Sequence, residues 1–115
     1  MDITRTGTTA RWSDTVSHNH TLYLVEVPTT LSADISGQAQ EMLASLEQSL
    51  VSAGSSKARL LMATIYLSDI SEIDAFNAIW DSWVPADTAP ARACVQAKLA
   101  KPGYRVEIQV IAALA

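Results

Sequence analysis

The residues best suited to chemistry lie in Pro90–Ile108, where an arginine, a cysteine and a glutamate fall in two segments of strand character. The segment Lys101–Gly103 separates them and predicts a turn, because proline presets one backbone angle and glycine tolerates positive φ. Strand alternation puts Arg92 and Cys94 on one face of the first segment. The pattern therefore predicts a hairpin that presents a guanidinium, a thiol and the Glu107 carboxylate close together.

Arg92 suits a carboxylate ligand, because a guanidinium presents a planar pair of donors and stays charged at any working pH. Glu107 suits the handling of water, because a carboxylate can hold a water molecule by hydrogen bond and relay its proton. Each residue also has a plainer interpretation. Arg92 would then be an interface salt bridge, and Glu107 a cross-strand partner of a cation such as Arg105.

Cys94 shares the predicted face of Arg92 and is the only cysteine of the chain. A covalent role would need a lowered thiol pKa, and no neighbouring histidine or helix N-terminus is expected to lower it. We therefore expect a small side chain that lines the site and is not a nucleophile. A lone cysteine cannot form an internal disulfide, which fits a reducing, cytoplasmic location.

The composition disfavours several classes of function. With 115 residues, 49% hydrophobic and 17% charged, the chain is predicted to form one globular domain over residues 1–115. A net charge of −4 with scattered cations disfavours nucleic acid as a partner. We expect neither a membrane span nor a signal peptide. His18 and His20 have no further ligands nearby, so no metal site is expected.

Periodicity predicts the elements of the first half. Thr4–Val16 is polar and is expected to form a short edge strand or ordered arm. Thr15–Ser17 and a strand over Thr21–Val27 are predicted to form a hairpin with its turn at Ser17–His20. A helix follows, with Ser32 as its N-cap and a stop at Gly54. Its apolar stripe comprises Ile35, Ala39, Met42, Leu43, Leu46 and Leu50. The solvent face is assigned Gln38, Glu41, Ser45 and Gln48.

The second half adds a strand, a helix and the two strands described first. Arg59–Leu67 is apolar on both faces, as in a central strand covered on both sides. A helix over Ile70–Val84 follows, with Asn77 on its apolar stripe. The order β-β-α-β-α-β-β predicts an α+β fold with two helices on one face of a mixed sheet. A second subunit is the simplest cover for the other face.

Several of these segments resemble a known family. The C-terminal signature of the RidA/YjgF family is similar to Pro90–Val95, Leu99–Ala100 and Val106–Ile108. Asp69 followed by Phe76-Asn77, and the element order, support the resemblance over essentially the whole chain. The Arg-Trp-Ser-Asp of Arg11–Asp14 looks most like the short YoaB-type members.

The resemblance implies a chorismate-mutase-like fold and a homotrimer whose sheets face a barrel-like core, with ligand sites in clefts between subunits. It implies hydrolysis of reactive enamines and imines, such as 2-aminoacrylate, to 2-keto acids and ammonia. The implied partner is a small carboxylate, and the resemblance implies neither a metal nor an organic cofactor.

The resemblance also assigns roles to residues. Arg92 corresponds to the arginine that grips the substrate carboxylate, and Glu107 to the glutamate that positions water. Cys94 and Asn77 match cleft-lining positions, although the Asn77 amide would serve equally to hold a backbone carbonyl. Trp12 is expected to pack or to reach the cleft. Leu24-Val25-Glu26 stands where the family's deaminases tend to have Ser-Gly-Gln, so Leu24 replaces a carboxylate-binding serine.

The sequence therefore supports two competing functions. The first is a trimeric deaminase of small 2-imino acids, with Arg92 as anchor. The second is a non-catalytic trimer that binds a 2-keto acid or a similar carboxylate, which the change at Leu24 and Glu26 would favour. Binding or cleavage of RNA fits poorly with the acidic charge.

Overall fold

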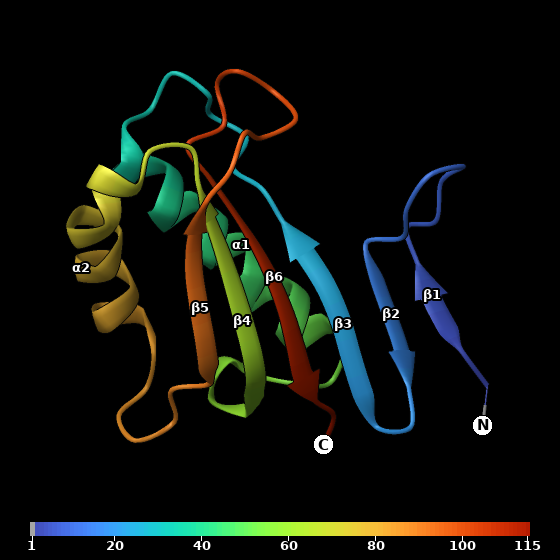
Figure 1. Ribbon diagram of the computed structural model, residues 1–115. Coiled ribbons are helices and arrows are strands. Elements are labelled where there is room, and N and C mark those ends of the chain that lie inside the picture. Colours follow the sequence, from blue (N-terminus) through green and yellow to red (C-terminus); the bar gives the residue numbers. More distant parts are fainter. Residues whose placement is uncertain (1) are drawn as a thin grey trace.

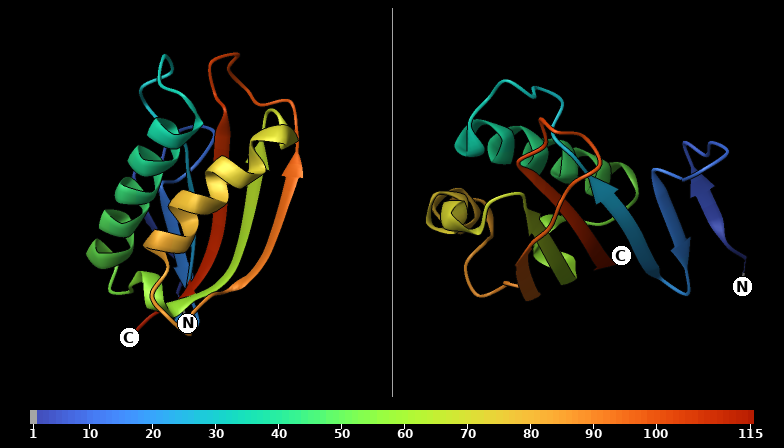
Figure 2. Two further views of the ribbon diagram at one scale, coloured as in Figure 1. Left: turned by 90° about the vertical axis from the view of Figure 1, so that its left-hand side faces the viewer. Right: turned by 45° about the horizontal axis from the view of Figure 1, so that its top comes forward.

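The computed structural model describes residues 2–115, which form one mixed sheet with two α-helices against one of its faces (Figures 1 and 2). In chain order the strands are β1 (Thr4–Thr6), β2 (Thr15–His18), β3 (Thr21–Glu26), β4 (Leu60–Leu67), β5 (Ala91–Gln96) and β6 (Val106–Ala113). The helices are α1 (Ile35–Ser52) and α2 (Ile73–Trp83), with short 3-10 turns η1 (Lys57–Arg59) and η2 (Ile70–Glu72). None of the helices within residues 2–115 is long and apolar enough to cross a membrane.

The six strands lie in the order β1-β2-β3-β6-β4-β5. All neighbours are antiparallel except β4 and β5, which are parallel and joined by α2. The predicted hairpin over Pro90–Ile108 is therefore wrong. A crossover helix leaves its two strands parallel, and β6 then enters the sheet between β3 and β4, where it gains a partner on each side.

The β2–β3 hairpin is confirmed, with Asn19 and His20 at its turn. Both residues have positive φ, at 53° and 59°, as a two-residue turn between twisted strands requires. The first helix is also confirmed, but its N-cap is Asp34 and not Ser32: the Asp34 carboxylate accepts from the Gly37 amide at 2.8 Å.

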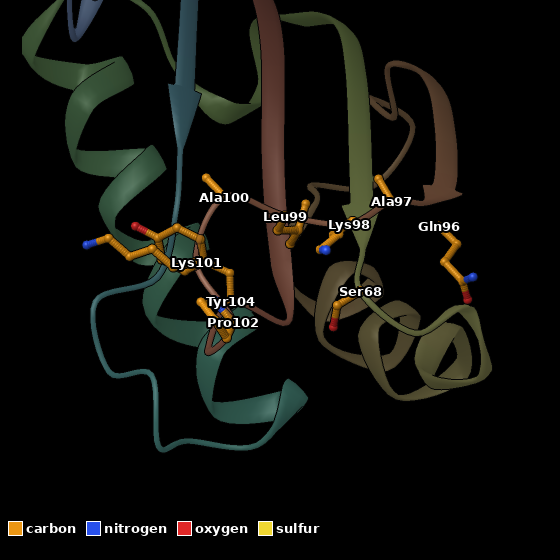
Figure 3. A pocket seen from close by; sticks show the side chains of 9 residues that line it. All are labelled: Ser68, Gln96, Ala97, Lys98, Leu99, Ala100, Lys101, Pro102 and Tyr104. Carbon is orange, nitrogen blue, oxygen red and sulfur yellow. The ribbon is translucent and has the colours of Figure 1, made fainter.

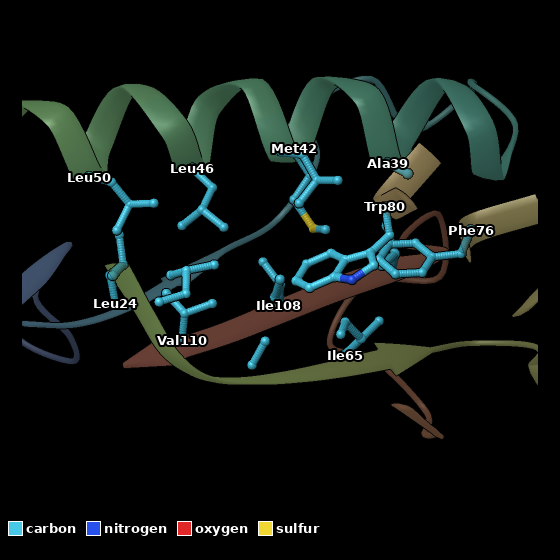
Figure 4. Packing of buried hydrophobic residues seen from close by; sticks show 14 of the residues in the cluster. Leu24, Ala39, Met42, Leu46, Leu50, Ile65, Phe76, Trp80, Ile108 and Val110 are labelled. Atoms are coloured by element: carbon cyan, nitrogen blue, oxygen red, sulfur yellow. The ribbon is translucent and has the colours of Figure 1, made fainter. Parts of the chain in front are cut away.

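The core lies between the helices and the sheet. Alternate residues of β3, β4 and β6 point toward α1 and α2, as the period of two in a strand dictates. Figure 4 shows this layer, with the apolar stripe of α1 above Ile65, Ile108 and Val110. The opposite face of the sheet, called the open face below, leaves Tyr23, Val25 and Val95 between 43% and 51% exposed.

Candidate functional site

Arg92 lies on β5, the strand at one edge of the sheet. It stands beside Ala63 of β4, which is wholly buried beneath the helices, so the Arg92 side chain is on the helix face. Its guanidinium carbon lies 5.4 Å from the centre of the Trp80 ring. Among residues 2–115, no carboxylate within 4.0 Å and no hydrogen bond engages this half-buried guanidinium. It is a cation whose donors are available to a ligand.

Cys94 lies two residues further along β5 on the same face, beside Ile65, and packs against the core. Burial raises the pKa of the Cys94 thiol, and the positive charge of Arg92 opposes this rise only in part. The thiol is therefore protonated at neutral pH, which is the state of a lining group and not of an activated nucleophile.

Glu107 lies on β6 and points to the open face, next to Tyr66 of β4. It lines a shallow hollow of about 350 Å³ together with Tyr66, Gln109 and the segment 97–100. Arg92 and Glu107 thus lie on opposite faces of the sheet, on strands separated by β4. One protomer does not bring the two groups together as the predicted hairpin would.

A larger hollow of about 510 Å³ opens where β4 and β5 end and the chain loops back to β6 (Figure 3). It is lined by Ser68, Gln96, Ala97, Lys98, Leu99, Ala100, Lys101, Pro102 and Tyr104. Two lysines, a serine hydroxyl and a phenol among apolar groups give it a mixed lining. Sequence reasoning missed this hollow, because it treated 97–105 as strand and turn. The one sequence feature that pointed to this hollow is the turn at Lys101–Gly103, which lies beside the family signature.

The 97–105 segment is held by Gln38, which is wholly buried. The Gln38 amide nitrogen donates to the Gly103 carbonyl at 2.9 Å, and its oxygen accepts from the Arg105 amide at 2.8 Å. A side chain at Gly103 would meet the Leu31 Cβ at 2.7 Å, so glycine permits this close approach. The placement of Gln38 on the solvent face is therefore wrong, and the residue is a structural support for one wall of the hollow.

Asn77 lies on α2, and its side-chain oxygen is buried without a hydrogen-bond partner among residues 2–115. A buried acceptor in this state suits a donor supplied from outside the chain. Trp12 lies between β1 and β2 and is 62% exposed, so it does not pack in the core of the protomer.

Leu24 faces the core beside Val110 and is only 4% exposed (Figure 4). The prediction that its side chain lines a cleft is corrected by the strand register, which turns this position toward α1. Glu26 points the same way and accepts hydrogen bonds from Ser45 at 3.2 Å and Ser49 at 3.3 Å. Burial raises its pKa, and the two serine hydroxyls oppose this rise. Of the three changed positions, Val25 alone projects onto the open face.

No three His, Cys, Asp or Glu side chains gather as possible metal ligands within residues 2–115. The arrangement instead offers, on one face, a guanidinium that no carboxylate within residues 2–115 engages, beside a protonated thiol, and on the other face a carboxylate that lines a shallow hollow. A site that uses both groups has to draw them from two copies of the chain.

Comparison with known proteins identifies the family of the chain. The family model described as Endoribonuclease L-PSP matches residues 3–114. The RutC family protein YoaB of Escherichia coli is 46% identical over 114 residues, which are 99% of this chain and 100% of that protein. A RutC family protein of Haemophilus ducreyi is 38% identical over 97% of both chains.

Solved structures give the same result. A member of the YjgF protein family from Neisseria meningitidis superposes with a TM-score of 0.96 at 41% identity, covering 100% of this chain and 97% of that one. A protein from Salmonella typhimurium described as a putative translation initiation inhibitor superposes at 0.91 with 46% identity, covering 97% of each chain. The sheet and its two helices have the chorismate-mutase-like fold of these proteins. The chain belongs to the RidA/YjgF family and is of the short, YoaB-like type.

Proposed function

We propose that the protein is an enamine/imine deaminase, which hydrolyses small 2-imino or 2-enamino acids to 2-keto acids and ammonia. The observation that carries the proposal is the Arg92 guanidinium, half-buried within the family signature and free of any acidic partner among residues 2–115. A guanidinium whose donors are not taken up by an acidic side chain is suited to an anionic ligand. A small carboxylate matches its two parallel donors.

The separation of Arg92 from Glu107 supports a site shared between protomers of a homotrimer. Arg92 and Cys94 are on the helix face of the edge strand, and Glu107 is on the open face. The open face also exposes Tyr23, Val25 and Val95, which an adjacent subunit would cover. In a ring of identical subunits the edge of one protomer meets a different surface of the next, so Arg92 of one copy would face Glu107 of another.

The chemistry follows from these groups. Arg92 binds the substrate carboxylate and fixes the imine carbon within the cleft. Glu107 holds a water molecule and takes up a proton as the water oxygen adds to the carbon of the C=N bond. Return of this proton to the imine nitrogen gives the neutral carbinolamine. Glu107 then passes the proton of the carbinolamine hydroxyl to the amino nitrogen, the C–N bond breaks as the C=O bond forms, and ammonia and the 2-keto acid are released. Cys94 lines the cleft as a neutral thiol throughout.

The test is hydrolysis of 2-iminobutyrate and 2-aminoacrylate by the wild-type protein, Arg92→Ala and the matched control Arg105→Ala. Arg105 is a suitable control because its guanidinium already pairs with Glu72 at 3.4 Å. We expect loss of activity on the order of a hundredfold or more in Arg92→Ala, because a charged hydrogen-bonded anchor is removed, and little change in Arg105→Ala. A wild-type protein no faster than buffer would refute the proposal.

The second candidate is a trimer that binds a 2-keto acid at the same cleft without turnover. It is favoured by the change at position 25, where a valine 51% exposed on the open face stands in place of the glycine of the family's deaminases. This candidate predicts saturable binding of 2-ketobutyrate by calorimetry that disappears in Arg92→Ala, together with imine hydrolysis at the rate of buffer. Hydrolysis by the wild-type protein would exclude it.

A further inference from the structure

Trp80 is the aromatic residue that contacts Arg92, and it is firmly held. It is 5% exposed within α2, and its ring is stacked on Phe76, with centroids 6.2 Å apart and planes inclined by 28°. On another side it meets Trp83 at 5.6 Å and 38°. Figure 4 shows Trp80 and Phe76 side by side in the layer between helix and sheet. The indole is therefore a rigid group beneath the half-buried Arg92.

A guanidinium held over an aromatic face keeps its N–H donors. The attraction comes from the ring quadrupole acting on the delocalised charge, so it uses no hydrogen bond. A carboxylate partner would instead occupy the donors that a ligand needs, as Glu72 does for Arg105 at 3.4 Å. Among residues 2–115, the Arg92 guanidinium makes its cation–π contact with the ring of Trp80. This arrangement orients the cation and leaves it able to bind an anion.

We propose that Trp80 is a positioning residue for Arg92: its indole face holds the guanidinium in place through a cation–π contact and so sets the affinity for the ligand carboxylate. The inference rests on the proposed function, since it takes Arg92 as the carboxylate anchor. Trp80 acts through Arg92 and contacts neither the imine carbon nor the water held by Glu107. Its loss should therefore weaken binding and leave the chemical step nearly unchanged.

The test compares Trp80→Leu and Trp80→Phe with Trp83→Leu as a matched control. Trp83 belongs to the same aromatic layer, but its ring contacts Lys57 at 5.5 Å and not Arg92. Calorimetry measures the Kd for 2-ketobutyrate, and the deaminase assay separates KM from kcat. For Trp80→Leu we expect Kd and KM to rise about fivefold with kcat unchanged, for Trp80→Phe a smaller rise, and for Trp83→Leu none.

A spectroscopic measurement tests the contact without any ligand. In ¹⁵N-labelled wild-type protein, the Arg92 side-chain Nε–H signal, identified by its absence in Arg92→Ala, should be shifted upfield by the Trp80 ring. The shift should persist in Trp80→Phe and Trp83→Leu and vanish in Trp80→Leu. An unshifted wild-type signal overturns the proposal, even if Trp80→Leu does not fold.

The outcomes also separate this proposal from the one on which it rests. If Arg92→Ala abolishes binding and Trp80→Leu leaves Kd and KM at wild-type values, the role of Trp80 is refuted and the function stands. If Arg92→Ala binds 2-ketobutyrate and hydrolyses imines as the wild type does, both the role of Trp80 and the proposed function are refuted. A fall in kcat in Trp80→Leu with unchanged KM would also contradict a positioning role.

Discussion

Replacement of Gln38 by leucine gives a stability prediction that can be worked from the structure. Gln38 is wholly buried on α1. Its amide nitrogen donates to the carbonyls of Gly103 at 2.9 Å, Leu31 at 3.3 Å and Ala33 at 3.3 Å. Its oxygen accepts from the Arg105 amide at 2.8 Å. Leucine has nearly the same volume but makes none of these bonds, so Gln38→Leu isolates their contribution.

The hydrogen bonds to Gly103 and Arg105 are the two shortest of the four, so they are taken as the main contributions to stability. A buried backbone group left without its partner costs about 1–3 kcal/mol. Gly103 and Arg105 are partly reached by solvent, so the lower end of that range applies to each. The sum is a loss of about 2–3 kcal/mol in the free energy of unfolding, or about 8–12 °C in Tm for a domain of this size.

The assay is chemical and thermal unfolding of wild type, Gln38→Leu and the control Gln48→Leu. Gln48 is an exposed glutamine of the same helix, and its replacement should change stability by no more than about 0.5 kcal/mol. If Gln38→Leu proved as stable as the control, the buried amide would contribute no net stabilisation, and its role in holding the 97–105 segment would be refuted.

Three further predictions concern titratable groups. Cys94→Ala should keep its deaminase rate within about threefold of wild type, since the thiol is protonated; a hundredfold loss would indicate a nucleophile. Glu26→Gln should raise Tm at pH 7, because it removes a charge that burial disfavours. This gain should fade as the pH falls through the raised pKa of Glu26, because the wild-type carboxyl then becomes neutral as well. Equal Tm values at pH 7 would contradict this. Hydrogen bonds from Thr30 and Thr29 lower the pKa of Glu41 from 4.5 to about 2. The stability that Glu41 provides above pH 4.5 should therefore be lost toward pH 2, and Glu41→Gln should flatten that part of the unfolding profile, whereas parallel profiles would refute it.

Local signals predicted most of the elements. The run Thr21–Glu26 and the stripe of α1 depend on periods that the chain carries within a few residues, so the β2–β3 hairpin and both helices agree with prediction. The pairing of β5 and β6 was not predictable in this way. A turn signal at Lys101–Gly103 favoured a hairpin, whereas the α2 crossover and the position of β6 between β3 and β4 are long-range effects.

The site residues illustrate the same limit. Position 38 is three residues after Ile35 and four before Met42, so periodicity alone places it on the buried face of α1. Because the Gln38 side chain is a polar amide, it was predicted to face solvent. Its hydrogen bonds to the Gly103 and Arg105 backbone groups explain why it is buried instead. The strand register likewise decides that Leu24 faces the core. The family resemblance singled out Arg92 and Glu107 as candidates, but it did not indicate that they lie on opposite faces of one sheet.

The most direct test of the central proposal is subunit complementation between Arg92→Ala and Glu107→Gln, each expected to be inactive alone. If each cleft takes Arg92 from one protomer and Glu107 from another, co-refolding equal amounts should restore imine hydrolysis. Random assembly would make about a quarter of the clefts intact, since each of the two residues is present with a chance of about one half. Recovery of about a quarter of the wild-type rate is the predicted result. A mixture that remains as inactive as its two parents would contradict the shared site.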